Sequence, residues 1–401
     1  MFRFPTLTES YNTLLKSKPM DILKQLLIIS ILYLVSMPTK AQDAIKKRGR
    51  DLGIPFDGIP GKYNAITDVP GIEVGYNTLI SGSGNKAART GVTVILPKGK
   101  TDKSYPAAWF SLNGDGEMTG LPYIEDYGKG NGPIAITNTN SVGVVRDAVG
   151  EWSVKKFSNN NQDDFSFGLP VVAETWDGML NDINGFHVKK EHVWQALDNA
   201  SNKQIKEGNV GGGTGMICYW FKGGSGTASR IFTIDSVQYT LGVFVQANFG
   251  IRKDLVVSGV PVGKEIQDLM PIENKVDRKD GSIIVIVATD APLLPGTLKL
   301  VAKRVTHGIA RTGSISSNGS GEIFLALSTA SPTYNSKHSE ETWNVISKWS
   351  LDPIFRATVE ATEEAIVNAL LAAEDMEGKN GNKVFALPQN RLQQILKKYN
   401  R

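Results

Sequence analysis

Short apolar runs, most of them four to eight residues long and bounded by Gly, Asn, Asp or Pro, dominate the first two thirds of the chain. This pattern is typical of β-strands. It predicts strands over Gly71–Tyr76, Val92–Leu96, Ala107–Leu112, Ile134–Thr137, Leu169–Ala173 and Tyr239–Gln246. Two segments with helical spacing interrupt them. One is expected to be capped by Ser141, and the apolar positions of the two helices are Val142, Val145 and Ala148, then Val193, Ala196, Leu197 and Ala200.

After residue 281 the pattern changes to strand, helix, strand, helix, helix. The run Ile283–Thr289 is continuously apolar, as in strands that are covered on both faces. The later elements are expected at Leu298–Ile309, Glu322–Ser328, Ile354–Ala373 and Arg391–Tyr399. Buried strands with helices on either side predict an α/β fold, a layered sandwich. No internal repeat is present, and the only candidate linker is Asn274–Asp280.

The N-terminus predicts a secretory signal peptide over residues 1–41. Three lysines precede the 12-residue apolar run Leu26–Met37, and the small residue Ala41 lies before Gln42. A positive segment, a short apolar segment and a small residue at the cut describe such a peptide, and the run is too short for a comfortable membrane span. We therefore expect a chain starting at about Gln42 (with Met20 as an alternative start codon), exported to the periplasm or beyond the cell and not inserted in a membrane.

Composition narrows the function further. The 401 residues carry a net charge of only +4, and the basic residues form no stripe, which argues against a nucleic-acid partner. The four histidines show no metal-binding pair, and the glycines of Gly211–Gly215 do not fit a dinucleotide loop. The single cysteine, Cys218, has no obvious base beside it and is expected to be a small buried residue. We expect neither a metal nor a cofactor.

Ser282 stands between a charged segment and a buried strand, directly after Gly281. A plain turn is one interpretation. The scarcity of histidines argues against a Ser-His-Asp triad. If the chain were cut before Ser282, the new α-amine, with a pKa of ~8, would lie beside the hydroxyl and could act as its base. Gly281 would leave the approach to that peptide bond unhindered.

Two further groups suit such an enzyme. Ser320 and Glu322 are two residues apart, so their side chains share one face if a strand begins there; a plain turn at Asn318–Gly319 is the alternative. Asn248 ends a strand-like run, where its amide could donate to a developing oxyanion.

Several stretches carry a resemblance to a known family: FSLNGDGEMTG, TNTNSVGVVRDAV, LPVVAETWDGMLNDINGF, GNVGGGTGMICYWFKGG, VFVQANFG and DGSIIVIVATDAPLLP. Over nearly its whole mature length the sequence resembles the L-aminopeptidase D-amidase/D-esterases and β-peptidyl aminopeptidases. These are self-processing serine enzymes with a fold like that of the N-terminal nucleophile hydrolases. The resemblance implies a layered α-β-β-α sandwich.

The resemblance also implies that the single catalytic domain, residues 42–401, cuts itself between Gly281 and Ser282. The products would be a larger chain, 42–281, and a smaller chain, 282–401, which stay together. Ser282 would be the nucleophile, Ser320 and Glu322 its hydrogen-bonding and proton-handling partners, and Asn248 the oxyanion donor.

Two more positions follow from the resemblance. Glu174 falls where the family places an acid near the free amine of the substrate. Trp176 occupies a position where at least one family member has a tyrosine assigned to the catalytic centre. An indole N–H can donate a hydrogen bond but cannot take up a proton, so any acid–base role of that tyrosine is lost here.

The implied activity is removal of the N-terminal residue from small peptides, amino-acid amides or esters, with the preference for L-, D- or β-amino acids left open. A homo-oligomer of processed two-chain units is expected. Two alternatives remain at this point. One is acyl transfer of the ornithine acetyltransferase type, which the serine and the export signal oppose. The other is an uncleaved, non-enzymatic binding protein.

Overall fold

The computed structural model describes residues 46–158, 168–274, 281–335 and 340–401. The predicted signal peptide, the charged segment Lys275–Asp280 and His338 lie outside the described residues. Residues Lys47–Arg401 form one compact unit. No helix in the described ranges is both long enough and apolar enough to cross a membrane.

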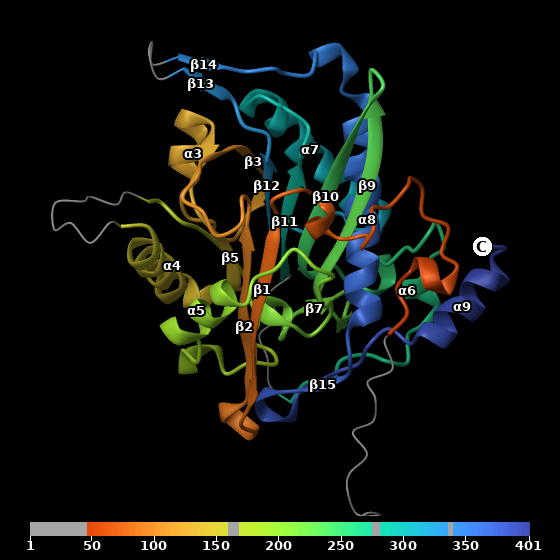
Figure 1. Cartoon of the computed structure of the whole chain (residues 1–401). Helices are drawn as coiled ribbons and strands as arrows, with labels where there is room; N and C mark the ends of the chain where they lie inside the picture. Colours follow the sequence, from red (N-terminus) through yellow and green to blue (C-terminus); the bar gives the residue numbers. More distant parts are fainter. Residues whose placement is uncertain (1–45, 159–167, 275–280, 336–339) are drawn as a thin grey trace, which may run out of the picture. The chain divides into compact units, whose positions relative to one another are not determined.

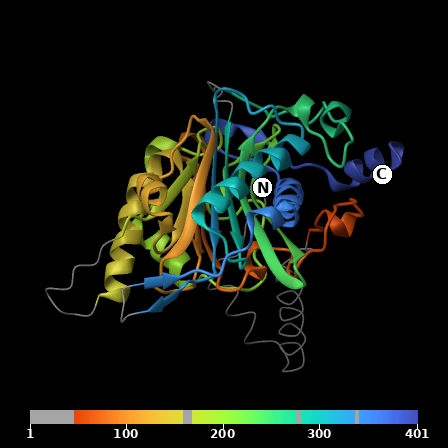
Figure 2. The same cartoon turned by 90° about the horizontal axis from the view of Figure 1, so that it is seen from above.

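Two β-sheets lie face to face in this unit, as Figures 1 and 2 show. Across the first sheet the order is β4 (Lys129–Gly130), β3 (Tyr105–Gly114), β12 (Ser320–Ser328), β11 (Gly281–Thr289), β10 (Val237–Phe249) and β9 (Gly224–Ile234). The second sheet has the order β1 (Glu73–Ser81), β2 (Ala88–Leu96), β5 (Ile134–Asn138) and β6 (Val171–Thr175).

Helices cover the outer face of each sheet (Figure 1). The helices α7 (Pro295–Arg311) and α8 (Asp352–Ala372) pack on the six-stranded sheet, and α4 (Val142–Phe157) and α5 (Lys190–Asp198) pack on the four-stranded sheet. The smaller elements are α3 (Leu121–Tyr127), α6 (Val262–Glu265), α9 (Gln389–Lys398), β7 (Ile217–Cys218), β8 (Phe221–Lys222), β13 (Thr333–Asn335), β14 (Glu340–Thr342), β15 (Met376–Glu377) and β16 (Lys383–Val384). The predicted layered α-β-β-α sandwich is confirmed.

Three buried apolar clusters match the three contacts between layers. Along β11 the side chains alternate between two of them: Val285 and Val287 belong to the core under α7 and α8, whereas Ile284 and Ile286 belong to the core between the sheets. A third core lies between the four-stranded sheet and α4 and α5. Since β11 is buried on both faces, its continuous apolar run is explained.

The predicted strands and helices all exist, with boundaries that differ by a few residues. The order strand, helix, strand, helix, helix after residue 281 is confirmed, with the short hairpin strands β13 to β16 added. One capping prediction is wrong, because Ser141 occupies the N-cap of α4 but its side chain makes no capping hydrogen bond.

The apolar pattern did not predict β9, which begins with glycine and serine. The reason is a close approach of α8: a Cβ at Gly226 would lie 2.1 Å from the carbonyl oxygen of Ala365. Only a residue without a side chain fits there, and glycine normally argues against a strand. Packing, rather than propensity, selects the residue at this position.

A buried ionic network joins the segment before β1 to α8. The carboxylate of Glu364 is fully buried and lies 2.7 Å from the Arg230 guanidinium and 3.0 Å from that of Arg50. Its other hydrogen-bond partner is the Asn64 amide, at 2.6 Å. Two cations and an amide thus satisfy a buried charge that would otherwise strongly destabilise the fold.

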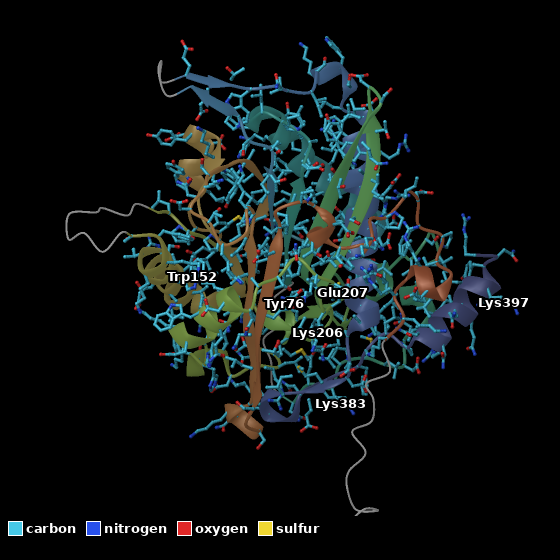
Figure 3. The ribbon with its side chains drawn as sticks, in the orientation of Figure 1. Tyr76, Trp152, Lys206, Glu207, Lys383 and Lys397 are labelled. Carbon is cyan, nitrogen blue, oxygen red and sulfur yellow. The ribbon has the colours of Figure 1, made fainter. Side chains whose placement is uncertain are left out.

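A second polar contact lies at the loop before β9. Glu207 pairs with Arg48 at 2.7 Å, and the hydroxyl of Tyr76, from β1, donates to the Lys206 carbonyl at 2.9 Å (Figure 3). The loop is therefore fixed to both the N-terminal segment and the four-stranded sheet.

Replacing Gly226 by alanine should destabilise the fold by about 1–3 kcal/mol, the usual effect of adding atoms to a packed core. Gly143→Ala is the matched control. Gly143 lies in α4 with no atom within 4 Å of an added Cβ, so this variant should be neutral or stabilised by up to ~1 kcal/mol. Urea unfolding of both variants measures the difference, and equal stabilities would show that the approach of α8 does not restrict residue 226.

Candidate active site

Ser282 is the second residue of β11, in the middle of the six-stranded sheet, and only 4% of its surface is exposed. Its partner in the antiparallel strand β10 is Asn248, and its partner in the parallel strand β12 is Gly321. Strand pairing thus brings three separate segments of the predicted site into one row. The row fixes which groups surround the Gly281–Ser282 peptide bond.

Gly281 is restricted more tightly than the sequence suggested. Its φ is +105°, a region that residues with side chains rarely adopt. An added Cβ would also lie 2.1 Å from the carbonyl oxygen of Asn248. The glycine therefore sets the backbone at the head of β11 as well as leaving the peptide bond unhindered.

The two faces of the sheet carry different parts of the predicted site. Side chains alternate along strands, so Ser282 faces the core between the sheets, as Ile284 does. Ser320 is paired with Gly281, and Glu322 with Ile283, whose side chain lies in the core under the helices. Since β12 begins at Ser320, the prediction that Ser320 and Glu322 share one face is confirmed, but it is the face opposite to the Ser282 hydroxyl.

Asn248 is held by two hydrogen bonds. Its Oδ1 accepts from the Ile217 N–H at 2.8 Å, and its Nδ2 donates to the Trp176 carbonyl at 2.9 Å. These partners determine the orientation of the amide, because only Nδ2 can donate and only Oδ1 can accept. A side-chain amide carries two N–H groups, so Nδ2 has a second proton with which to donate to an oxyanion.

Glu174 lies on β6, in the other sheet, and is 4% exposed. Its carboxylate accepts from the Glu117 N–H at 3.1 Å and from the Thr139 hydroxyl. Gly116 connects it with the Ser282 row, since a Cβ there would be 3.3 Å from Glu174 Oε1 and 3.6 Å from the Cα of Gly321. Gly116 therefore lies between the buried, oriented carboxylate of Glu174 and the head of β12.

Trp176 follows β6 directly, and it contributes to this region through its backbone carbonyl, which binds Asn248. Its indole packs against Gly178, where an added Cβ would be 2.5 Å from the ring, and against the small cluster of Met179 and Leu180. The Trp176 side chain therefore has a packing role in this region.

Ser320 and Glu322 form an unsatisfied polar pair. Both are buried, and among the described residues the Ser320 hydroxyl and the two carboxylate oxygens of Glu322 have no hydrogen-bond partner of normal geometry. Burial raises the pKa of Glu322 to about 7, although the adjacent Ser320 hydroxyl opposes the rise. A carboxyl group with this pKa can exchange protons near neutral pH, and perturbed groups of this kind are typical of functional sites.

The other sequence candidates behave as simple structural residues. Cys218 is fully buried, and burial raises the pKa of its thiol. His192 accepts the Lys189 N–H at the start of α5, and His187 lies 3.1 Å from Asp182. His307 is exposed on α7. No group of three or more His, Cys, Asp and Glu residues suited to a metal ion exists in the described ranges.

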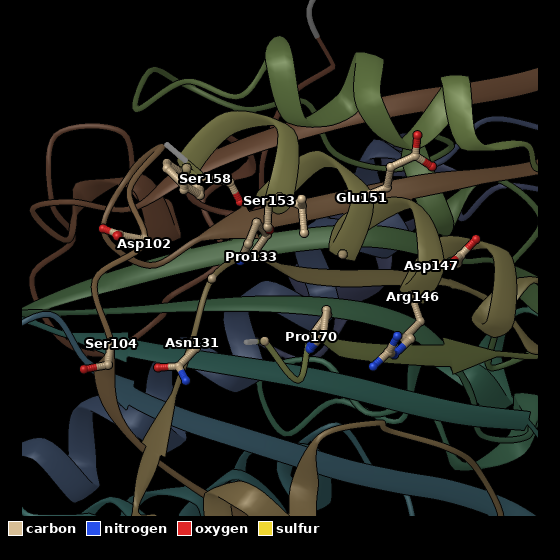
Figure 4. Close-up of a pocket in the computed structure, with 15 residues that line it drawn as sticks. Asp102, Ser104, Asn131, Pro133, Arg146, Asp147, Glu151, Ser153, Ser158 and Pro170 are labelled. Atoms are coloured by element: carbon tan, nitrogen blue, oxygen red, sulfur yellow. The ribbon is translucent and has the colours of Figure 1, made fainter. Parts of the chain in front are cut away.

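A cavity of about 810 Å³ lies away from this region, beneath α4 (Figure 4). Its lining includes Asp102, Asn131, Arg146 and Glu151, and none of the predicted site residues. It is therefore separate from the row that contains Ser282.

Sequence reasoning missed the residues that hold the predicted ones. Thr139 fixes Glu174, and Gln246 bonds the Thr137 carbonyl and the Thr175 hydroxyl across the two sheets. Thr139 lies in the stretch TNTNS, whose clustered hydroxyl and amide residues after a strand were the available signal. The partner of Thr139 depends on the pairing of β5 with β6, and the partners of Gln246 depend on how the two sheets face each other.

The sandwich with a buried serine at the head of a central strand has the architecture of the N-terminal nucleophile hydrolases. Comparisons with known proteins agree. The family model for Peptidase family S58 matches residues 64–384. The chain is similar to two β-peptidyl aminopeptidases, from Sphingosinicella microcystinivorans (50% identical, covering 90% of this chain and 94% of the other) and from Sphingosinicella xenopeptidilytica (44% identical, covering 87% and 91%).

Among solved structures, the L-aminopeptidase D-Ala-esterase/amidase of Ochrobactrum anthropi superimposes with a TM-score of 0.83 at 44% identity, over 89% of this chain and 99% of that one. That protein is described as a prototype of the serine aminopeptidases and as a variant of the Ntn hydrolase fold. The chain belongs to peptidase family S58. It is therefore a serine aminopeptidase, a hydrolase, and the non-enzymatic alternative is excluded.

The buried carboxyl group of Glu322 should make the chain less stable as pH rises. Its folded pKa of about 7 exceeds the unfolded value of ~4.3, so the folded state binds more protons between these values and stability falls with pH through that window. In a Ser282→Ala background, urea unfolding at pH 4.5, 6 and 8 should show a smaller decline when Glu322→Gln is added. Identical declines in the two proteins would mean that Glu322 titrates normally.

Proposed function

We propose that Ser282 is the nucleophile of this aminopeptidase and that the chain exposes it by cutting itself between Gly281 and Ser282. The strand pairing is the observation that carries this proposal. It places the Gly281–Ser282 peptide bond at the head of a buried strand, with Asn248 beside Ser282 on one side and Ser320 beside Gly281 on the other.

In the proposed cut, Ser282 Oγ attacks the carbonyl carbon of Gly281 and the bond to the Ser282 nitrogen breaks, which leaves an ester. Water then hydrolyses the ester to a Gly281 carboxylate and a free Ser282 hydroxyl. The serine loses a proton as it attacks, and the departing nitrogen gains one. Ser320 lies next to this peptide bond, on the face opposite to the hydroxyl. We therefore assign to the Ser320–Glu322 pair the delivery of the proton that the departing nitrogen gains.

After the cut the nitrogen is an α-amine with a pKa of ~8, and it can take the proton of the Ser282 hydroxyl in each turnover. Ser320 and Glu322 then hydrogen-bond and orient this amine, which supplies the partner that their buried oxygens lack among the described residues. The acyl carbon of the substrate is attacked, its amine or alcohol leaves, and water releases the acyl group. Asn248 Nδ2 donates to the oxyanion in both reactions.

The proposed substrates are small peptides, amino-acid amides or esters with a free N-terminal amine, with β- and D-residues included. The relatives' names support this range, since they describe β-peptidyl aminopeptidases and an L-aminopeptidase with D-Ala-esterase/amidase activity. Glu174, buried and oriented by two hydrogen bonds, is assigned to the substrate ammonium. Trp176 is assigned a packing role at the edge of the substrate site.

We further propose that residues 1–41 are a signal peptide, that the enzyme works outside the cytoplasm, and that chains 42–281 and 282–401 stay together in a homo-oligomer. The sequence supports export. The buried pairs of Arg50 and Arg230 with Glu364 support association, because they would join the two chains after the cut.

Ser282→Ala should leave a single uncut chain without aminopeptidase activity, because the same hydroxyl performs both reactions. Denaturing gel electrophoresis and an assay with an amino-acid p-nitroanilide measure the two effects. Ser83→Ala, in an exposed loop, is the matched control and should give two bands and normal activity. Two bands from Ser282→Ala would place the nucleophile elsewhere.

Glu174→Gln should lower kcat/KM for substrates with a free amine. Losing a hydrogen bond between charged groups in a closed site costs ~1.5–3 kcal/mol, roughly ten- to a hundredfold in kcat/KM. For N-acetylated substrates, kcat/KM should be low in the parent enzyme, and Glu174→Gln should change it little. The matched control is Glu117→Gln, which alters an exposed carboxylate but keeps the backbone N–H that bonds Glu174. Unchanged turnover in Glu174→Gln would refute the assignment.

A further inference from the structure

Lys222, on the short strand β8, is a buried cation without an ion pair in the described part of the chain. No part of its surface is exposed. Its Nζ donates to the carbonyl oxygens of Met216 at 2.8 Å and Gly223 at 2.9 Å, with a longer contact of 3.4 Å to that of Gly213. Burying an ammonium group without a carboxylate is strongly unfavourable. A hydrophobic residue of similar size at this position would destabilise the fold less.

The acceptors around Nζ match the charged form. An ammonium group has three donors and no acceptor, and three carbonyl oxygens surround it here. A neutral amine would direct a lone pair at one of them. Burial lowers the pKa of Lys222 to about 7, so the lysine carries its charge at neutral pH and below in a substantial fraction of molecules.

One of the three carbonyls belongs to a peptide group that also contacts Asn248. The Met216–Ile217 peptide accepts from Lys222 through its oxygen, and from the Gly223 N–H at 2.9 Å. Its N–H, at Ile217, donates to Asn248 Oδ1 at 2.8 Å. A single peptide group therefore separates the ammonium of Lys222 from the side-chain amide of Asn248.

This arrangement has two effects on Asn248. The fixed peptide orients the amide, because its N–H requires Oδ1 on that side and so turns Nδ2 toward the Trp176 carbonyl. Hydrogen bonds in series also polarise one another. A cation at the carbonyl strengthens the Ile217 N–H as a donor, this draws electron density from Oδ1, and the N–H groups of Nδ2 become stronger donors in turn.

We propose that Lys222 is a positioning residue for the oxyanion donor, which orients Asn248 and strengthens its N–H groups through the Met216–Ile217 peptide. The proposal rests on the role of Asn248 given under the proposed function. It explains why a charge is kept in this hairpin, since an oxyanion donor gains from a fixed positive potential behind it in a site closed to water. Lys222 itself touches neither the substrate nor Ser282.

The test uses Lys222→Met and Lys222→Gln in the full chain, measured for kcat, KM and the rate of self-cleavage. We expect kcat to fall roughly tenfold to a hundredfold, less than the ~10²–10³-fold that loss of a whole oxyanion donor produces. KM should change little, because the interaction strengthens only as negative charge develops. The Gln variant keeps donors for the Met216 carbonyl without the charge, so it provides a folded protein if the Met variant does not.

The decisive measurement is a double-mutant cycle with Asn248→Ala. If Lys222 acts through Asn248, adding Lys222→Gln to Asn248→Ala should lower kcat by less than twofold, because interacting residues are not additive. The matched control is Arg252→Met. Arg252 is also buried and binds carbonyls of the same hairpin, those of Tyr219 and Trp220, but neither belongs to the peptide that contacts Asn248. Its effects should be fully additive with those of Asn248→Ala.

The outcomes separate this inference from the proposed function. Normal kcat in Asn248→Ala would remove the oxyanion role and with it both proposals for that residue. A low kcat in Asn248→Ala, together with normal kcat in the two Lys222 variants or with additive effects in the cycle, would overturn the role of Lys222 alone. Melting temperatures of all variants identify any loss of kcat that comes only from unfolding.

Discussion

The register of three strands, β10, β11 and β12, is the constraint on which the rest of the site depends. It aligns Asn248, Ser282 and Gly321 in one row. Because side chains alternate with a period of two, a slip of one residue would move the Ser282 hydroxyl to the opposite face of the sheet. The apolar pattern of β11 cannot prevent such a slip, since both faces of this strand are buried and apolar.

Glycines at close contacts fix the register instead. A Cβ at Gly281 would meet the Asn248 carbonyl, and one at Gly321 would lie 2.4 Å from the Asp115 carbonyl. The loop at residues 211–213 is similarly restricted, with a Cβ at Gly212 only 2.2 Å from Gln246 Oε1. Each of these positions accepts only glycine. A shifted register would place a residue with a side chain there, and that side chain would overlap with neighbouring atoms. The same tight packing brings the 211–217 segment against Asn248.

Two buried charges near Ser282 have no counter-ion in the described ranges, and both destabilise the fold. Glu322 lies on one side of the Gly281–Ser282 peptide, and Lys222 is connected to Asn248 on the other side. Other buried charges are paired, as Arg230 and Glu364 show. Buried charges without a counter-ion on both sides of one peptide bond indicate that function, and not stability, keeps them there.

The sequence by itself determined the elements and several local relations. Continuous apolar runs predicted β11 and β12, helical spacing predicted α7 and α8, and the period of two placed Ser320 and Glu322 on one face. The tertiary structure alone decided three things. It made β9 a strand despite its glycines, because α8 approaches Gly226. It brought Glu174, from the other sheet, close to Gly116, which contacts Gly321 in the row of Ser282. It set the Ser282 hydroxyl and the Ser320–Glu322 pair on opposite faces. These relations join residues far apart in the chain, so they depend on how sheets and helices pack, which no local pattern of apolar and polar positions contains.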